Sequence, residues 1–314
     1  MTKRIIFFGT PQFAVNSLKK IVEEGFNIVA VVTVPDRPAG RGRQIRTSAV
    51  KDFARTLGMK TLQPTNLKDQ EFTKQLFELK PDLMIVVAFR MLPKSIWSIP
   101  AHGTFNLHAS LLPEYRGAAP INWVIINQEK FTGVTTFLIN DKIDAGAILL
   151  QEKVQIEEND TAGSLHDKLS VKGSELICKT IKGIFESTIT PKKQESKGEK
   201  KLAPKLNKKN IFIQWDQPLE VINAKIKGLS PYPGAKSNWI ENQKVMVIKI
   251  FDAEIFKEKH NFIKNKVIIK DKKILIAHPD GFINCRILQL PNKKRMSAID
   301  LLNGISFSNK LEVS

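Results

Sequence analysis

Two side chains suited to stabilising an oxyanion, and a carboxylate that could support one of them, lie in the middle of the chain. In the segment TFNLHASLLPEYRGAAP, Asn106 and His108 are two residues apart on a predicted strand, so both point to the same face. An amide and an imidazole side by side can donate two hydrogen bonds to an oxyanion. Asp144 follows in the turn INDKIDAGAIL, and a carboxylate near an imidazole favours the protonated ring. Together the three predict a catalytic site.

The segment that follows His108 is rich in glycine and proline. Residues 110–113 and 116–120 have a restricted backbone and lead into a helix N-terminus, an arrangement that holds ligands through main-chain groups. Taken singly, His108 and Asp144 also have structural interpretations, because a lone histidine is usually a satisfied structural residue and Asp-Ala-Gly is a common turn. The combination with this segment favours a ligand site.

Alternating strand and helix patterns must position these residues. Residues 4–8 and 28–33 are apolar or β-branched runs, and a helix between them begins at Pro11 and ends at Gly25. Further strands are predicted over residues 82–89, 104–108, 133–140 and 147–156, and further helices over 48–57, 68–79, 118–127 and 161–185. The alternation predicts an α/β domain with a doubly wound, mostly parallel sheet, which binds ligands at its carboxyl edge.

The composition changes after residue 188. Residues 188–205 lose hydrophobic periodicity and are rich in Lys, Glu, Ser and Pro, which is typical of a linker. Beyond them, turn residues separate the short runs IFIQW, KVMVIKIF, KVIIK, KILIAH and FINCRILQL, the pattern of a small antiparallel barrel or sandwich. We therefore predict a first domain over residues 1–188, a linker over 189–205 and a second domain over 206–314.

The net charge of +18 is unevenly distributed. Residues 191–314 carry 25 basic and 12 acidic side chains, a net charge of about +13, which leaves about +5 for residues 1–190. A field of this sign attracts polyanions, with RNA the leading candidate. A solvated, lysine-rich surface explains the charge equally well.

Two further features limit the class of protein. No run of about 18 apolar residues is present, and the N-terminus leads directly into a strand, so we expect a cytoplasmic protein without a membrane span. Cys178 and Cys285 lie far apart and lack the spacing of a disulfide framework or a zinc site, so we expect two core thiols and no metal. We also expect a monomer.

The string NLHASLLPEYRGAAP resembles the signature of the 10-formyltetrahydrofolate-dependent formyltransferases. The catalytic trio of that family is Asn, His and Asp, which the resemblance places at Asn106, His108 and Asp144. Here Ile143-Asp144-Ala145-Gly146 stands where relatives have Leu-Asp-Thr-Gly. The opening IIFFGTPQFA, the loop PDRPAGRGR and the strings SPYPGA and MSAIDLLNG are similar to those members that formylate initiator methionyl-tRNA on its α-amino group.

This resemblance covers nearly the whole chain. It implies a Rossmann-like catalytic domain followed by a smaller OB-like β-barrel domain that binds tRNA. It also implies a folate site whose lining is formed by Ser110, Leu111, Leu112 and Pro113, with the pterin at Phe89, Arg90 and Met91. Ala88-Phe89-Arg90 replaces the usual Ala-Tyr-Gly, and the run to Leu92-Pro93 is one residue shorter.

The loop over residues 34–46 is rich in Pro, Gly and Arg. Its four arginines are suited to contacting phosphates near the acceptor end of a tRNA, as the resemblance implies. They are Arg37, Arg41, Arg43 and Arg46. Without the resemblance, a solvated surface loop is the simpler interpretation.

Three other functions fit parts of the sequence. A nicotinamide oxidoreductase would need the G-x-G-x-x-G spacing, which is missing around Gly9. A non-enzymatic RNA-binding protein would not require Asn106, His108 and Asp144 together, and the second domain has no RRM or KH signature. A formyltransferase for a small amine, such as glycinamide ribonucleotide or an amino sugar nucleotide, would need neither the arginine loop nor a basic second domain.

Overall fold

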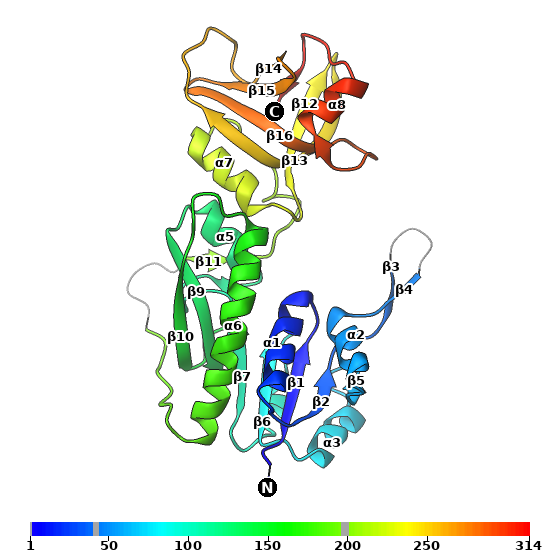
Figure 1. The fold of residues 1–314 in the computed structure, drawn as a ribbon, viewed down its shortest axis with the longest axis vertical. Coiled ribbons are helices and arrows are strands. Elements are labelled where there is room, and N and C mark those ends of the chain that lie inside the picture. Colours follow the sequence, from blue (N-terminus) through cyan, green and yellow to red (C-terminus); the bar gives the residue numbers. More distant parts are fainter. Residues whose placement is uncertain (1, 40–43, 196–200) are drawn as a thin grey trace. The chain divides into compact units, whose positions relative to one another are not determined.

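The computed structural model describes residues 2–39, 44–195 and 201–314 (Figure 1). These residues form two compact units, each assembled from three parts of the chain. The N-terminal unit comprises Met1–Gly117, Phe131–Gln155 and His166–Leu202. The barrel unit comprises Ala118–Lys130, Ile156–Leu165 and Ala203–Ser314.

Within the described residues, a seven-stranded sheet forms the centre of the N-terminal unit. Its strands are β1 (Ile5–Gly9), β2 (Ile28–Val32), β5 (Thr61–Leu62), β6 (Leu83–Val87), β7 (Thr104–His108), β9 (Phe131–Leu138) and β10 (Ile148–Gln155). They lie in the order β10-β9-β7-β6-β1-β2-β5. The pairs from β5 to β7 are parallel, whereas β9 is antiparallel to both β7 and β10. The predicted Rossmann-like, mostly parallel sheet is confirmed.

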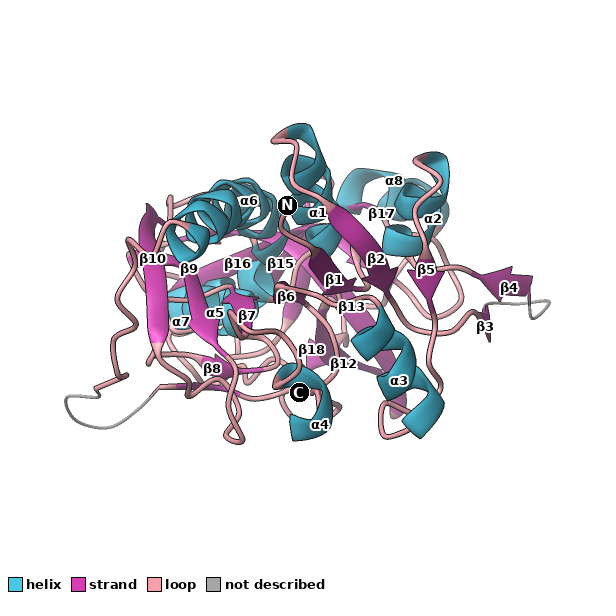
Figure 2. Ribbon diagram, turned by 90° about the horizontal axis from the view of Figure 1, so that it is seen from below, coloured by secondary structure: helices cyan, strands magenta, loops and turns pink. Residues whose placement is uncertain are grey.

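Helices cover both faces of this sheet (Figure 2). One face carries α1 (Gln12–Glu23), α2 (Ala49–Thr56) and α6 (Ala162–Phe185), and the other carries α3 (Gln70–Glu78) and α4 (Lys94–Trp97). In β1, Ile6 and Phe8 share a hydrophobic cluster with Phe72 of α3, whereas the alternate residues Ile5 and Phe7 are fully buried toward the opposite face. Burial on both faces of the sheet explains why β1 is a continuous apolar run.

Two short strand pairs accompany the sheet. β3 (Arg37–Ala39) and β4 (Gln44–Arg46) form an antiparallel hairpin where the sequence predicts only a loop. Arg37 lies directly opposite Arg46 in its register. The second pair is β8 (Arg116–Gly117) with β11 (Leu202–Ala203).

The barrel unit is an antiparallel, nearly closed barrel, as predicted. Its strands are β12 (Ala235–Glu241), β13 (Lys244–Phe256), β14 (Val267–Lys270), β15 (Lys273–His278), β16 (Gly281–Gln289) and β18 (Glu312–Val313), in the order β14-β15-β16-β13-β12-β18, with β17 (Met296–Ser297) beside β16. A bridge between Lys266 and Glu312 joins the two ends of this order. The helices of this unit are α5 (Pro120–Ile126), α7 (Leu219–Gly228) and α8 (Ala298–Gly304).

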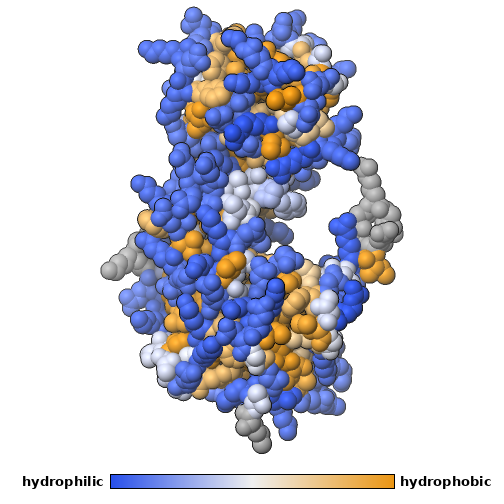
Figure 3. Space-filling view, viewed as in Figure 1, coloured by the Kyte–Doolittle hydropathy of each residue, from blue (hydrophilic) through white to orange (hydrophobic). Residues whose placement is uncertain are grey.

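The barrel core is filled by aliphatic side chains around the fully buried Trp239. The run IFIQW, predicted as a strand, makes only an isolated parallel bridge between Phe212 and Lys236. Its alternating residues Ile211 and Ile213 nevertheless point into the core, so the alternation reports burial and not strand pairing. On the face shown in Figure 3, the surface of this unit is mostly hydrophilic, which agrees with its lysine-rich sequence.

Both cysteines are buried free thiols, in agreement with the sequence prediction. Burial raises the pKa of the Cys178 thiol to about 11, and burial also raises the pKa of Cys285. Neither thiol is therefore a reactive thiolate near neutral pH.

Candidate active site

The carboxyl ends of three neighbouring strands bring the predicted site residues together. In the pairing of β1, β6 and β7, Gly9 lies opposite Val87, and Val87 lies opposite Leu107. Residues 88–91 follow β6 directly, and β7 ends at His108. This is the edge at which open α/β sheets bind ligands.

Asn106 is half-buried in β7, between Val86 of β6 and Phe137 of β9. Its Oδ1 is buried and has no hydrogen-bond partner among the described residues. Thr10 Oγ1, directly after β1, and Arg90 Nε, after β6, are also buried and unpartnered in that part of the chain. Because buried polar atoms are nearly always hydrogen-bonded, three such atoms at neighbouring strand ends indicate a place for a polar ligand.

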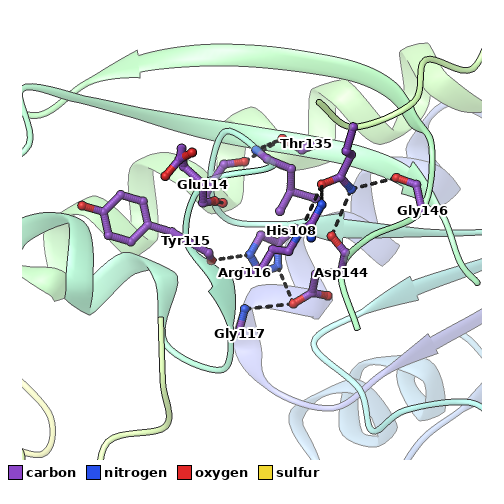
Figure 4. Close-up of polar contacts among 11 residues, drawn as sticks. His108, Glu114, Tyr115, Arg116, Gly117, Thr135, Asp144 and Gly146 are labelled. Atoms are coloured by element: carbon purple, nitrogen blue, oxygen red, sulfur yellow. Dashed lines mark hydrogen bonds and ion pairs between the residues drawn. The ribbon is translucent and has the colours of Figure 1, made fainter. Parts of the chain in front are cut away.

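His108 is fixed through both of its ring nitrogens (Figure 4). Nε2 lies 2.9 Å from the carbonyl oxygen of Tyr115, and since a carbonyl only accepts, Nε2 carries a hydrogen and donates it. Nδ1 faces Asp144 Oδ2 at 3.8 Å, and the two side chains are only 8% and 13% exposed. A second proton on Nδ1 would complete a shielded ion pair.

The carboxylate of Asp144 is held from two directions. Its Oδ2 accepts a hydrogen bond of 3.0 Å from the backbone N–H of Gly117 in addition to facing His108. The backbone of Asp144 has a φ of +50°, in the left-handed region that costs free energy for a residue with a Cβ. Two residues later, a Cβ on Gly146 would lie 1.6 Å from the carbonyl oxygen of Leu138, so only glycine fits there.

The structure adds a residue that the sequence does not single out. Gln194 donates hydrogen bonds from Nε2 to the carbonyl oxygens of Asp144 (3.0 Å) and Gly146 (2.7 Å). Its Oε1 accepts from Nε of Arg116 at 3.1 Å and also from Nη2. No local signal marks Gln194, because it lies in a lysine-rich segment and its partners are distant in the sequence.

The predicted folate loop follows β7 directly. Ser110 and Leu112 are buried, whereas Leu111 and Pro113 are half-buried. The Ser110 hydroxyl donates a hydrogen bond of 2.6 Å to the carbonyl oxygen of Glu114, so it stabilises the conformation of the loop. What this loop offers to a ligand is therefore its half-buried apolar side chains and its main chain.

Thr135 of β9 organises this loop. Its Oγ1 donates to the carbonyl oxygen of Ser110 (2.6 Å) and accepts from the backbone N–H of Leu112 (3.1 Å) and from Nε2 of Gln151 (2.9 Å). Gln151 also donates to the carbonyl oxygen of Leu112 (2.9 Å). One hydroxyl with its full hydrogen-bonding capacity in use thus fixes the loop against the sheet.

The residues predicted to meet the pterin lie after β6. Phe89 packs edge-on against Phe8 with ring centroids 5.7 Å apart, and the guanidinium of Arg90 lies over the Phe89 ring at 5.6 Å. Arg90 also donates to the carbonyl oxygens of Pro64 and Thr65. Met91 is 62% exposed, so its side chain lies outside the packed part of this region.

Of the four predicted tRNA-contacting arginines, Arg37 and Arg46 are exposed on the β3–β4 hairpin. Arg41 and Arg43 lie outside the described residues. Two like charges directly opposite each other on a hairpin oppose its stability. An anion between them would remove that repulsion.

Neither a metal site nor a membrane-spanning helix is found among the described residues. They contain no group of three or more His, Cys, Asp and Glu side chains that could hold a metal ion. In the same residues, no helix combines the length and the apolar character that crossing a membrane requires.

The fold is a Rossmann-like sheet, with Asn106 and His108 near the carboxyl end of β7, followed by an antiparallel barrel, and both parts match models of formyl transferase domains. The formyl transferase family model matches residues 3–181, and the model of the formyl transferase C-terminal domain matches residues 205–306. The chain belongs to the formyl transferase family.

Its relatives include proteins named methionyl-tRNA formyltransferase. The methionyl-tRNA formyltransferase of Flavobacterium johnsoniae is 50% identical over 310 residues, which cover 99% of this chain and 98% of the relative. The methionyl-tRNA formyltransferase of Bacteroides thetaiotaomicron is 46% identical over 311 residues, 98% of this chain and 97% of the relative.

Solved structures share the fold at lower identity. The N-formyltransferase from Helicobacter canadensis, in complex with folinic acid and dTDP-3-aminofucose, is 24% identical with a TM-score of 0.67, over 93% of this chain and 100% of that chain. HypX from Aquifex aeolicus, in complex with tetrahydrofolic acid, is 17% identical with a TM-score of 0.66, over 96% of this chain and 47% of that chain. At these identities the similarity shows the fold alone.

Proposed function

We propose that the chain transfers the formyl group of 10-formyltetrahydrofolate to the α-amino group of methionine on initiator tRNA, giving formylmethionyl-tRNA for translation initiation. The observation that carries this proposal is the shielded His108–Asp144 pair next to Asn106, whose buried Oδ1 is unpartnered within the described chain. The names and the near full-length similarity of the relatives support the choice of acceptor.

When bound, 10-formyltetrahydrofolate supplies a formyl carbon that an amine can attack, and the formyl oxygen then gains negative charge. In this proposal Asn106 donates a hydrogen bond to that oxygen, after a half-turn of its amide that exchanges Oδ1 and Nδ2. Both ring nitrogens of His108 are directed elsewhere, because Nε2 donates to the carbonyl oxygen of Tyr115 and Nδ1 faces Asp144. Asn106 is thus the side chain that donates a hydrogen bond directly to the formyl oxygen, whereas the sequence alone predicts that Asn106 and His108 both do so.

Asp144 has two roles in this scheme. Its Oδ2 faces His108 Nδ1 and orients the ring, and the carboxylate accepts the proton that the attacking amine must lose. The proton then passes, directly or through water, to the folate nitrogen that leaves the formyl carbon. The bond to the incoming amine forms before the bond to the folate nitrogen breaks, and the formyl group passes from one nitrogen to the other without a covalent bond to the protein.

The co-substrate is assigned to the loop and strand end beside these residues. Ser110, Leu111, Leu112 and Pro113 supply main-chain groups and apolar contact, and Phe89, Arg90 and Met91 flank the pterin. The unpartnered Arg90 Nε and Thr10 Oγ1, taken within the described residues, supply polar atoms that such a ligand could satisfy. These features suit a heterocycle that has an apolar surface and a polar edge.

The tRNA acceptor is supported by the distribution of charge. Residues 191–314 carry 25 basic and 12 acidic side chains, and the β3–β4 hairpin presents Arg37 and Arg46 to solvent. A small amine acceptor would need neither feature. We further propose that the protein acts as a monomer in the cytoplasm, which light scattering and cell fractionation test.

The test is to incubate the purified protein with 10-formyltetrahydrofolate and charged initiator methionyl-tRNA and to measure formylmethionyl-tRNA. Asn106→Ala should lower turnover by about 10²- to 10³-fold, the usual effect of removing one oxyanion donor. Asn303→Ala, at an exposed position of α8, is the matched control. A loss below about tenfold removes Asn106 from this role. Formylation of glycinamide ribonucleotide or an amino sugar nucleotide, without formylation of the tRNA, would redirect the proposal to a small amine.

A further inference from the structure

Gln194 uses the whole hydrogen-bonding capacity of its side-chain amide. Its two N–H groups donate to the carbonyl oxygens of Asp144 and Gly146, and its oxygen accepts from two nitrogens of Arg116. Carbonyl oxygens only accept and a guanidinium only donates, so these partners allow a single orientation of the amide. The side chain therefore ties the turn that carries Asp144 to the segment after β7.

The backbone around Gln194 is itself held to the N-terminal unit. Two residues earlier, Lys192 and Ile148 exchange backbone hydrogen bonds of 2.7 and 2.8 Å. Further along the chain, the carbonyl oxygen of Lys201 accepts from Tyr115 N–H at 2.6 Å, and Lys201 N–H donates to a carboxylate oxygen of Glu114 at 2.9 Å. The described parts of the predicted linker thus form hydrogen bonds with the segment over residues 114–117 at two places, Gln194 and Lys201.

That segment also holds the two ionisable members of the proposed trio. Its Tyr115 carbonyl accepts from His108, and its Gly117 N–H donates to the Asp144 carboxylate. The left-handed backbone of Asp144, at a φ of +50°, persists only if its surroundings restrain it. Gln194 supplies that restraint through the hydrogen bond from its side-chain amide to the carbonyl oxygen of Asp144.

We infer that Gln194 is a positioning residue of the formyl-transfer site. It holds the main chain at Asp144 and Gly146 so that the Asp144 carboxylate stays in line with His108 Nδ1 and Gly117 N–H. This inference rests on the proposed function for its kinetic consequences. Its structural consequence, the restraint of the turn over residues 144–146, is independent of the substrate.

Two substitutions separate positioning from general support of the fold. Gln194→Ala removes all four hydrogen bonds, whereas Gln194→Glu keeps an acceptor for Arg116 but turns an oxygen toward the two carbonyls. For both we expect kcat to fall by about 10- to 100-fold with nearly unchanged KM values, as for small misplacements of a catalytic group. The pH profile of kcat should also shift, because the His108–Asp144 pair is loosened. Glu195→Gln, at the exposed neighbouring position, is the matched control.

Hydrogen–deuterium exchange provides the readout that needs no substrate. In both variants, measured well below the melting temperature of each, the Gly117 amide should exchange faster than in the wild type and in Glu195→Gln. A Gln194→Glu variant with wild-type kcat and pH profile, or with unchanged exchange at Gly117, would overturn the inference. If the wild type does not formylate methionyl-tRNA, the proposed function fails, and the exchange result alone then decides the positioning role.

Discussion

Replacing Gly146 with alanine should displace the carboxylate that faces His108. The added Cβ would lie 1.6 Å from the carbonyl oxygen of Leu138, whereas ordinary contacts begin at 3.4 Å. Leu138 is held in β9, where its N–H donates to the carbonyl oxygen of Ala147 at 2.9 Å. The turn must therefore move by about 1.8 Å relative to β9, and Asp144 moves with it.

A misplacement of about 1 Å can cost about 10²-fold in rate, so we expect kcat to fall by roughly two orders of magnitude. Overpacking of this kind also costs about 1–3 kcal/mol of stability. The assay is formylation of methionyl-tRNA at saturating folate, with thermal unfolding measured on the same preparations. Gly304→Ala is the control, because a Cβ at Gly304 meets no atom within 4 Å.

The reasoning is refuted if Gly146→Ala is folded and its kcat lies within about threefold of wild type. A drop that Gly304→Ala shares would show instead that the assay responds to alanine substitution in general. A lower melting temperature with unchanged turnover would mean that the turn relaxes without moving Asp144.

Three further outcomes are expected. Thr135→Val should weaken folate binding in calorimetry, because each buried partner left unpaired costs about 1–3 kcal/mol. Arg46→Ala should lower the slope of log tRNA affinity against log salt by about 0.7–0.9, measured by filter binding. Hydrogen bonds from Lys182 and Lys20 hold the pKa of Glu24 at about 2, below its ordinary 4.5, so this pairing stabilises the fold above pH 4.5. Glu24→Gln should therefore lower the melting temperature slightly at neutral pH, and the difference should disappear as the pH falls toward 2.

Each of these outcomes has a matched control. Thr56→Val removes an exposed hydroxyl whose acceptor, the carbonyl oxygen of Phe53, belongs to the same helix. Arg55→Ala removes an arginine that is 74% exposed on α2, outside the hairpin. Glu23→Gln alters the carboxylate next to Glu24. Equal effects of a test variant and its control would contradict the corresponding prediction.

β1 and β6 could be predicted because burial on both faces makes them continuous apolar runs, whereas the two residues of β5 are too few to form a pattern. The prediction of a strand over residues 211–215 is wrong, because an alternating pattern shows only which side chains are buried and not whether the backbone pairs in a sheet. The β3–β4 hairpin was missed because Arg37–Ala39 and Gln44–Arg46 have weak β-propensity.

The trio could be placed from its types and spacing, but its supports could not. Tyr115 contributes a backbone carbonyl oxygen, which every residue type has, so the residue type does not reveal this role. Gln194 lies 50 residues from Asp144 in a segment with linker composition. Thr135 lies within the predicted strand over residues 133–140, but no local signal indicates its role, since its partner Ser110 is 25 residues away. Such contacts depend on tertiary proximity, which a single sequence does not encode locally.

Between α6 and the barrel unit, Gln194 and Lys201 both form hydrogen bonds with the segment over residues 114–117. These contacts affect where two enzymes of this family can be joined in a chimera. In a chimera joined at residue 188, Gln194 and Lys201 would come from the enzyme that contributes the barrel unit. The turn at Asp144, with which Gln194 must pair, would come from the other enzyme. A junction after residue 203 keeps both with the sheet they brace. The segment that looks most dispensable by composition is thus a poor crossover point, and homologous exchange there should select for matching residues at positions 116 and 194.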